Sequence, residues 1–487
     1  MMRRFSAAAV SLVLLVGGIS PMRAFAEPYD SYTYDRWGDA VPSQAGYIAE
    51  RAVSGADLGV GDFSGLSDIF RAGDGTFYLV DTGNDRVVAV DSGFSEVLGI
   101  YDTFTMEDGS QTRLKEPSGI FVSDELIYIA DTGNSRVLVS DPEGRAAMEI
   151  TKPESEVYDQ KKTFLPQKVI ADKGGNIYVV LNNITTGAAM FDRSGEFTGF
   201  YGPNRVEPTA HIVLEHFRGL FMSDEKRAGR RRSVPTGITG FDVDGDFIFT
   251  CTSSSSQSTD TVKKLNAAGK NIFSGYDVTF GDYTPMYDSA QNRLLSSAIV
   301  DIDISEDGNI NCLDRTAGRI FQYDEDCELL FITGGIADQL GGFDTVSAIE
   351  SAGDRLYVTD SAKNTVTVFR ETDFGRLVHE ASALHNGGYY EEALEPWLEV
   401  LSRDGNYRRA YTGAAAGYLR KGEYEKSMKY ARLAGEQRIY NKAFEGWRRE
   451  FLQEHSGIIV SAAGILLAAA VIIGIIRKRK FRRKEEQ

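Results

Sequence analysis

The sequence predicts a mainly β protein, a six-bladed β-propeller, followed by an α-helical module and one transmembrane helix. Three observations lead to this prediction. A seven-residue segment, Asp81–Val87, returns almost letter for letter as Asp131–Val137, 50 residues later, and a period of this size indicates a repeat architecture. Weaker copies continue to about residue 369, where the strand pattern changes to helical periodicity. A run of 20 uncharged, mostly apolar residues then comes near the end.

Each repeat contains a predicted β-hairpin. Before the two strong copies lie short apolar runs, Thr76–Val80 and Leu126–Ala130. After them lie β-branched runs, Val87–Val90 and Val137–Val139, and strand, polar turn, strand is the pattern of a hairpin. The turns of the six units begin near positions 81, 131, 181, 251, 314 and 360. Six units of four short strands predict a six-bladed propeller.

The polar turns carry the signature Asp-x-x-Asn-x-Arg-Val. This signature resembles that of the NHL-repeat family of six-bladed β-propellers, strongly in two copies and less well in the others. A residue that recurs once per blade is better explained by blade architecture than by one active site, so we interpret these residues as turn formers and inter-blade bonds. They are Asp81, Asn84, Arg86, Asp131, Asn134, Arg136, Asp314, Arg319, Asp360 and Asn364.

The propeller is expected to span residues 46–370 and to close with a strand from its own beginning. The last unit lacks a fourth strand, because the chain becomes helical after Phe369. An unpaired strand edge invites aggregation, so another segment must cover it. The segment at about 46–53 has strand character and precedes the first blade. We therefore expect it to close the sixth blade.

Residues 374–455 form the predicted helical module. Gly387–Leu394 aligns with Lys421–Met428 at an offset of 34 residues, which is the tetratricopeptide spacing. The segment resembles two such repeats. Counting strands, the chain leaves the last blade on the face opposite the Asp-x-x-Asn turns. We expect the helices on that face, unless they fold along the side of the propeller.

The two ends of the chain carry targeting signals. Residues 1–26 have a charged start, an apolar run and the small-x-small site Ala24–Ala26, which is typical of a secretory signal. Residues 457–476 are long enough to span a bilayer, and the tail at 477–487 is basic. Positive residues favour the cytoplasmic side. The sequence therefore predicts a single-pass protein of a bacterial cell membrane, with its N-terminal ectodomain outside.

Charge and cysteine content exclude some classes of function. The formal net charge of the chain is −17. The signal contributes +3 and the tail +5, so residues 27–455 have a net charge of −25. Such an acidic ectodomain disfavours nucleic acid as a partner. Three cysteines are too few for a disulfide scaffold. Cys312 and Cys327 fall in one blade and could pair, but three buried thiols is the interpretation we favour.

Two segments are candidate binding regions. Residues 27–45 form an aromatic-rich N-terminal arm, whose rings could stack on a glycan or, as we favour, pack against the propeller wall. Residues 201–235 form a long insertion that ends in five cations. These could bind an anionic ligand or partner surface, or could simply be solvated, as charge runs usually are. The cations are Lys226, Arg227, Arg230, Arg231 and Arg232.

No catalytic residues, metal or cofactor are assigned from the sequence. Six-bladed propellers include metal-dependent lactonases and lyases, so an enzyme is a fair alternative. His211 and His216 are the histidines of the propeller region, and their spacing of five does not place two ligands on one helical face. A calcium site made of channel carboxylates stays open, with Asp301 and Asp303 as conceivable contributors.

The preferred function is that of a non-catalytic, membrane-anchored binding or scaffold protein. The propeller face would bind a protein partner or glycan outside the cell, and the helical stalk would contact a membrane complex. An accessory subunit of a transporter is one protein that could have this arrangement. The alternative is an exported hydrolase or lyase, for example a metal-dependent sugar lactonase. Fold alone does not decide between them.

Overall fold

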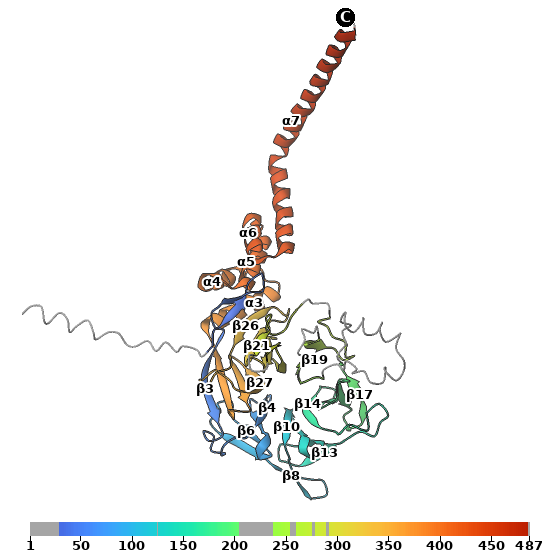
Figure 1. Ribbon diagram of the computed structural model, residues 1–487, viewed down its shortest axis with the longest axis vertical. Helices are drawn as coiled ribbons and strands as arrows, with labels where there is room; N and C mark the ends of the chain where they lie inside the picture. The colour runs from blue at the N-terminus through green and yellow to red at the C-terminus, as the bar shows by residue number, and fades with distance from the viewer. Residues whose placement is uncertain are drawn as a thin grey trace, which may run out of the picture.

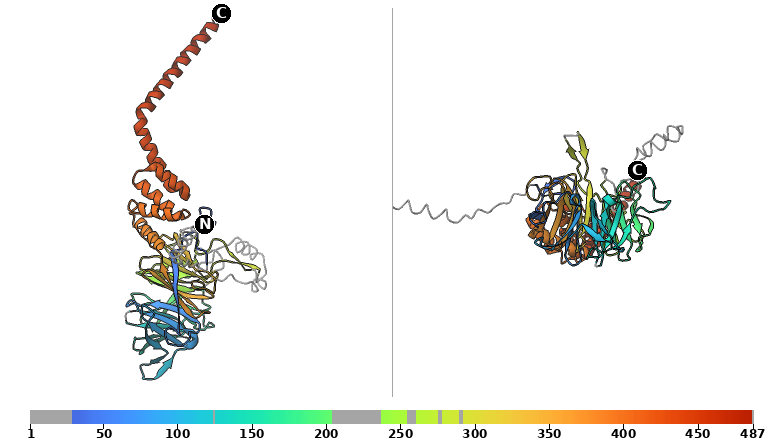
Figure 2. Two further views of the ribbon diagram at one scale, coloured as in Figure 1. Left: turned by 90° about the vertical axis from the view of Figure 1, so that its left-hand side faces the viewer. Right: turned by 90° about the horizontal axis from the view of Figure 1, so that it is seen from below.

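The computed structural model describes residues 29–123, 125–203, 237–253, 260–274, 278–288 and 292–485. The predicted signal at 1–26 and nearly all of the insertion at 201–235 lie outside these residues. Within them the chain forms a ring of β-sheets, a group of helices beside the ring and one very long helix (Figure 1). Two further views show the helical group between the ring and the long helix (Figure 2).

Six antiparallel sheets make the ring, and each is one blade. Blade 1 contains β4 (Leu66–Arg71), β5 (Phe77–Asp81), β6 (Arg86–Val90) and β7 (Val97–Tyr101). Blade 2 contains β10 (Pro117–Val122), β11 (Ile127–Asp131), β12 (Arg136–Ser140) and β13 (Ala146–Ile150). Blade 3 contains β14 (Pro166–Ala171), β15 (Ile177–Leu181), β16 (Ala188–Phe191) and β17 (Phe197–Tyr201). The predicted six-bladed, mainly β fold is confirmed.

The second half of the ring is less regular. Blade 4 contributes three strands within the described residues, β18 (Gly240–Asp244), β19 (Phe247–Cys251) and β20 (Val262–Leu265). Blade 5 contains β23 (Ile299–Ile304), β24 (Ile310–Asp314), β25 (Arg319–Tyr323) and β26 (Leu329–Thr333). Blade 6 contains β27 (Val346–Ala352), β28 (Arg355–Asp360), β29 (Thr365–Glu371) and β3 (Tyr47–Ser54). Short hairpins β8–β9 (Thr103–Thr105, Gln111–Arg113) and β21–β22 (Met286–Asp288, Arg293–Leu295) extend from connecting segments.

Strand β3 closes the ring from the N-terminal side. It pairs antiparallel with β29 from Thr365 opposite Ser54 to Glu371 opposite Tyr47. The predicted closing segment, 46–53, is therefore the fourth strand of blade 6. Consecutive innermost strands contact one another around the whole ring, including β27 against β4.

The N-terminal arm packs against the ring rather than projecting from it. Its strands, β1 (Tyr32–Tyr34) and β2 (Ala40–Pro42), form a two-stranded sheet. The Tyr34 ring is buried and stacks on Tyr283 with centroids 4.1 Å apart. The Tyr32 hydroxyl donates to Asp282 over 2.9 Å. Cys251, Cys312 and Cys327 are all buried and free.

Five helices follow the last blade. They are α3 (Asp373–Asn386), α4 (Leu394–Arg403), α5 (Arg408–Arg420), α6 (Tyr424–Ala434) and α7 (Gln437–Glu485). Helix α3 begins directly after β29, because the Thr372 hydroxyl accepts a hydrogen bond from the Gly375 N–H over 2.9 Å and caps the helix. Helix α7 contains a window of mean hydropathy 2.8 that has no buried residues, so it is long and apolar enough to cross a membrane.

The helices pack along the outer rim of the ring. Phe331 of β26, Phe374 of α3, Trp397 of α4 and the nearby Tyr407 share one buried cluster. Because β26 and β3 are the outermost strands of blades 5 and 6, this cluster lies at the side of the propeller. The chain leaves β29 at Glu371, the end away from the Asp360 turn, as counting strands predicts, and a large apolar contact then holds the helices against the side.

Candidate functional site

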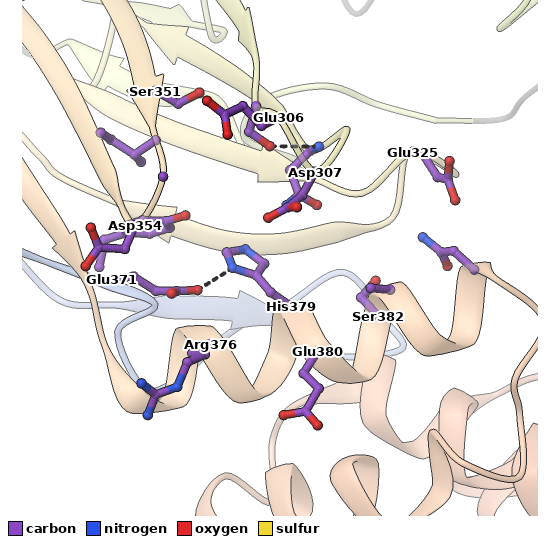
Figure 3. Close-up of a pocket in the computed structure, with 17 residues that line it drawn as sticks. Glu306, Asp307, Glu325, Ser351, Asp354, Glu371, Arg376, His379, Glu380 and Ser382 are labelled. Carbon is purple, nitrogen blue, oxygen red and sulfur yellow. Dashed lines mark hydrogen bonds and ion pairs between the residues drawn. The ribbon is translucent and has the colours of Figure 1, made fainter. Parts of the chain in front are cut away.

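A cavity of about 430 Å³ lies between the propeller and helix α3 (Figure 3). The propeller side of the cavity comes from the hairpin turns of blades 5 and 6 and from Tyr47 of β3. The helix side comes from residues of α3 between Arg376 and Asn386. The cavity therefore exists only because α3 packs beside the ring. Clefts between packed units are common places for ligands to bind.

The described lining of this cavity is strongly anionic. It includes one arginine, Arg376, which pairs with Asp373 over 2.7 Å, and one histidine, His379. Six carboxylates accompany them: Glu306, Asp307, Glu325, Asp354, Glu371 and Glu380. Such a surface concentrates cations and repels anions.

His379 lies at the inner wall and bonds at both ring nitrogens. Its Nδ1 is 2.5 Å from Oε1 of Glu371, at the end of β29 (Figure 3). Its Nε2 is 2.7 Å from Oε1 of Gln322, in β25. The side chains of His379 and Glu371 are 16% and 13% exposed, so both bonds are largely shielded from water. His379 therefore fixes α3 to two strands of different blades.

From Gln322 the hydrogen bonds continue across blade 5 to the centre of the ring. The Gln322 amide donates to Oδ1 of Asn311 over 2.9 Å, and the Asn311 amide donates to Oδ2 of Asp303 over 2.7 Å. Since a carboxylate accepts, these contacts fix both amide orientations and leave the Gln322 oxygen facing His379. Nε2 of His379 must then carry a proton. The helical region and the channel are joined by one chain of polar groups.

The channel contains a buried ion triad that crosses the ring. Nζ of Lys168, in blade 3, lies 2.5 Å from Oδ1 of Asp68 in blade 1 and 2.9 Å from Oδ1 of Asp301 in blade 5. These blades are not neighbours, so the three side chains meet at the centre. Burial alone would lower the pKa of Lys168, but the nearby Asp301 and Asp68 carboxylates outweigh burial and raise it. We name these three residues the balanced layer.

The remaining carboxylate oxygens of the balanced layer bond to the next blade. Oδ2 of Asp68 accepts from the Ile120 N–H over 2.9 Å, and Oδ2 of Asp301 accepts from the Ile349 N–H over 3.0 Å. Burial nevertheless raises the pKa of Asp68 to about 6. Each carboxylate thus serves both the central ammonium and an inter-blade contact.

Two residues further along the innermost strands lies a second group of acids, which we name the acidic layer. It consists of Asp242, Asp303 and Glu350, from blades 4, 5 and 6. Asp242 accepts from the Ile304 N–H over 2.7 Å, and Asp303 accepts from the Ser351 N–H over 3.1 Å. Phe70, Phe121 and Ile170 occupy the equivalent positions of blades 1 to 3.

Burial perturbs the protonation of the acidic layer. Burial and the neighbouring Asp303 raise the pKa of Asp242 to about 8. Burial, with a smaller contribution from Asp301, raises the pKa of Asp303 to about 6. Burial also raises the pKa of Glu350 well above its usual range, with Asp303 adding to the effect. Asp242 and Glu350 hold protons near neutral pH, because the described chain provides them no lysine or arginine comparable with Lys168.

Asp301 and Asp303, named above as conceivable calcium ligands, have other partners. Asp301 pairs with Lys168, and Asp303 accepts from Asn311. Across the described residues, no three histidine, cysteine or acidic side chains come close enough to hold a metal ion.

The repeated turn residues lie in separate blades and do not converge. Oδ1 of Asp81 accepts from the Ser64 N–H over 2.7 Å, and Oδ2 accepts from Asn84 and Arg86, each over 2.8 Å. In this way Asp81 binds its turn to the loop that leads into its blade. Asp131, Asn134 and Arg136 repeat the arrangement in blade 2, with the Lys115 N–H as the backbone donor.

The weaker copies keep the aspartate but change its surroundings. Asp314 accepts from the Ala298 N–H over 2.7 Å, and Asp360 accepts from the Asp344 N–H over 2.7 Å. Arg319 instead pairs with Asp282. Asn364 makes an inter-blade bond, because its Oδ1 accepts from the Gly65 N–H over 2.5 Å.

Lys226, Arg227, Arg230, Arg231 and Arg232 lie outside the described residues, as do His211 and His216.

Sequence reasoning missed Lys168, Asp68, Asp242, Glu350 and His379. A usable signal existed for the channel residues. Lys168, Asp68 and Asp301 are each the third residue of an innermost strand, so aligning those strands places them at one level of the ring. His379 has no comparable signal, because its partners come from distant segments.

No family model and no curated protein matches the sequence. Among solved structures, a streptogramin B lyase aligns with 68% of this chain and 100% of its own, at 11% identity and a TM-score of 0.41. Virginiamycin B lyase from Staphylococcus aureus aligns with 70% of this chain and 95% of its own, at 11% identity and a TM-score of 0.38. Hydrazine synthase of Kuenenia stuttgartiensis aligns with 67% of this chain and 99% of its own, at 13% identity and a TM-score of 0.37. At these values the likenesses assign no activity to the chain.

Proposed function

We propose that this chain is a membrane-anchored, extracytoplasmic binding or scaffold protein. The propeller, with its NHL-like repeats, binds a protein partner or glycan outside the cell. The tetratricopeptide-like helices contact a membrane complex, for which an accessory role beside a transporter is one setting. Helix α7 crosses the membrane once and places the basic tail in the cytoplasm.

One observation carries this proposal: the propeller and the helices share a single buried core. Fully buried Trp397, Phe369 and Tyr407 belong to it, and they come from a helix, a blade and the connection between two helices. A rigid junction of this kind holds the propeller at a fixed position relative to α7. Fixed placement beside a membrane suits a scaffold that presents a binding surface.

The state of the channel also supports a binding role. Lys168 pairs with both Asp68 and Asp301 at the centre of the ring, so these carboxylates already serve the structure. The cavity beside His379 has its polar wall bonded to three strands. Both features favour a stable platform.

Affinity capture of the full chain from gently solubilised membranes, with mass spectrometry, tests the proposal. We expect a reproducible partner, and two variants locate its site. Substituting Arg227, Arg230, Arg231 and Arg232 by alanine removes the basic patch of the insertion. Tyr389→Ser with Leu433→Ser alters the helical module, where these side chains are 59% and 50% exposed.

The variants separate the two modules. Loss of the partner with the arginine variant places binding on the propeller insertion, and loss with the helical variant places it on the stalk. Stoichiometric metal and lactone hydrolysis by a chain that captures no partner would reject the scaffold proposal in favour of the exported enzyme. Resistance of the chain to alkaline extraction tests the anchor separately.

A further inference from the structure

A groove of about 540 Å³ lies where helix α7 leaves the helical module. Tyr424 and Glu425, at the start of α6, form one side. Trp447, Phe451 and residues between them on α7 form the other. We name it the juxtamembrane groove, because the apolar segment 457–476 follows in the same helix. A Cβ at Gly446 would lie 2.3 Å from the Tyr424 ring, so this glycine allows the ring to approach α7.

The groove offers aromatic faces. Trp447 and Phe451 stack with centroids 5.3 Å apart, and His455 continues the stack at 4.3 Å from Phe451. Phe451 is 41% exposed. The Trp447 Nε1–H donates to Oε1 of Glu425 over 3.3 Å, which sets the orientation of the indole. Aromatic faces attract cations, and cages of such rings recognise ammonium groups.

The rim of the groove supplies negative charge. Glu450 and Glu454 are four residues apart on the face that carries Trp447 and Phe451. Neither has a basic partner within ion-pair distance in the described part of the chain. Lys426 also lines the groove, but it pairs with Glu423 over 2.5 Å and lies above the Tyr418 ring.

The position of the groove along helix α7 indicates which kind of ligand it can meet. With a rise of 1.5 Å per residue, Glu454 lies about 5 Å and Trp447 about 15 Å before Gly457, where the apolar segment begins. The polar headgroup region extends roughly 5–8 Å beyond the hydrocarbon core on each side. The lower end of the groove is therefore at headgroup level when residues 457–476 span the bilayer.

We propose that the juxtamembrane groove binds the ammonium headgroup of a zwitterionic phospholipid at its membrane-proximal end, with Phe451 as the aromatic wall, Glu450 and Glu454 as the counter-charges, and Trp447 stacked on Phe451 at the far end of the groove. The inference rests on the proposed membrane anchor. Neither a basic protein segment nor a soluble amine explains why the groove adjoins the apolar segment, and each becomes an outcome of the test.

Fluorine NMR of the full chain labelled with 5-fluorotryptophan provides the test. The chain has three tryptophans, and Trp37 (73% exposed) and the fully buried Trp397 serve as internal references. The protein is placed in phosphatidylglycerol nanodiscs that contain increasing phosphatidylethanolamine. We expect the Trp447 resonance to shift saturably, while the other two stay constant. Loss of one signal in Trp447→Phe assigns the resonance.

A pair of double variants makes the result specific. Glu450→Gln with Glu454→Gln should raise the half-saturating fraction of phosphatidylethanolamine by about fivefold or abolish the shift, since two counter-charges are lost. Glu436→Gln with Glu445→Gln removes the same charge from positions outside the groove and should leave the response unchanged. Equal responses of the two double variants would overturn the proposal.

Three further outcomes contradict it in distinguishable ways. A Trp447 signal insensitive to the headgroup, in a chain that resists alkaline extraction, rejects the groove and leaves the anchor standing. Alkaline extraction of the chain rejects the anchor itself. A Trp447 shift produced by millimolar phosphoethanolamine or by oligolysine, without phosphatidylethanolamine in the disc, assigns the groove to a soluble or protein cation instead.

Discussion

The balanced layer and the acidic layer are adjacent levels of one channel, yet their carboxylates have different partners. In the balanced layer, Lys168 lies within 2.9 Å of both Asp68 and Asp301. In the acidic layer, Asp242 and Glu350 have backbone donors, and Asp303 adds an asparagine. A buried charge is stabilised by a partner of opposite sign, whereas one without it tends to keep its proton. The comparison teaches that one ring can keep carboxylates ionised in the balanced layer while Asp242 and Glu350 stay protonated in the acidic layer beside it.

The largest effect is expected from Lys168→Met, which removes the ammonium and leaves Asp68 and Asp301 buried without a counter-charge. Breaking a buried ion pair in this way costs about 3–5 kcal/mol. Denaturant unfolding of the purified protein measures the loss. Adding Asp68→Asn and Asp301→Asn to the same chain should restore most of the stability. A Lys168→Met protein within about 1 kcal/mol of wild type would show that the layer is not balanced as described.

An intermediate effect is expected from Asn311→Leu, which interrupts the polar chain between the acidic layer and His379. The Gln322 amide and one Asp303 oxygen lose a buried partner, which costs about 1–3 kcal/mol. Thermal or denaturant unfolding measures it. Asn441→Leu, on the surface of α7, is the matched control and should change stability by no more than about 0.5 kcal/mol. Similar stability losses in the two variants would mean that the polar chain from Asp303 to His379 does not contribute to the stability of the protein.

Asp242→Asn should make the protein more stable at high pH. The pKa of Asp242 is raised to about 8 in the folded protein, and an unfolded aspartate titrates near 4. Between these values the folded state holds a proton that the unfolded state has lost, so this group lowers stability as pH rises from about 4 to 8. The variant should gain stability over wild type progressively as pH rises from about 4 to 8, and should gain nothing at pH 4. Urea midpoints across this range measure the difference. A gain independent of pH would contradict the protonated state.

The smallest effect is expected from Arg71→Gln at the mouth of the channel. Arg71 of blade 1 reaches Glu306 of blade 5 over 2.7 Å, with side chains 28% and 68% exposed. Exposed pairs contribute about 0–1 kcal/mol and weaken in salt. The variant should therefore differ little from wild type at low ionic strength and not at all in 1 M salt. A loss comparable with that of Lys168→Met would show that the mouth, rather than the balanced layer, holds the blades together.

The ring was predictable because its repeats are local. The apolar runs around Asp81 and Asp131 lie within a few residues of their turns, and the closing segment near Tyr47 has strand character of its own. The arrangement of the channel residues was not predictable in this way, because Lys168 is 100 residues from Asp68 and 133 from Asp301 in the sequence. Only the superposition of blades brings such residues together.

The position of the helices required information that the strand count does not contain. A Cβ at Gly46 would lie 2.3 Å from the ring of Phe331, and one at Gly375 would lie 2.3 Å from the Gly46 carbonyl oxygen. These glycines let β3, β26 and α3 approach closely. Their sequence context predicts a turn as readily as a tight packing point, so the rim contact emerged only from the structure.

The pairing of β3 with β29 imposes an order on biosynthesis. The ribosome produces Ser54 long before its partner Thr365, with 310 residues in between. Until β29 arrives, five blades can form but the ring stays open, and closing so large a loop is slow compared with forming each hairpin. Since β29 leads directly into the helices, the final closure and the docking of α3 belong to one late step. The nascent chain thus exposes a strand edge through most of its synthesis, the stage at which a chaperone would be most useful.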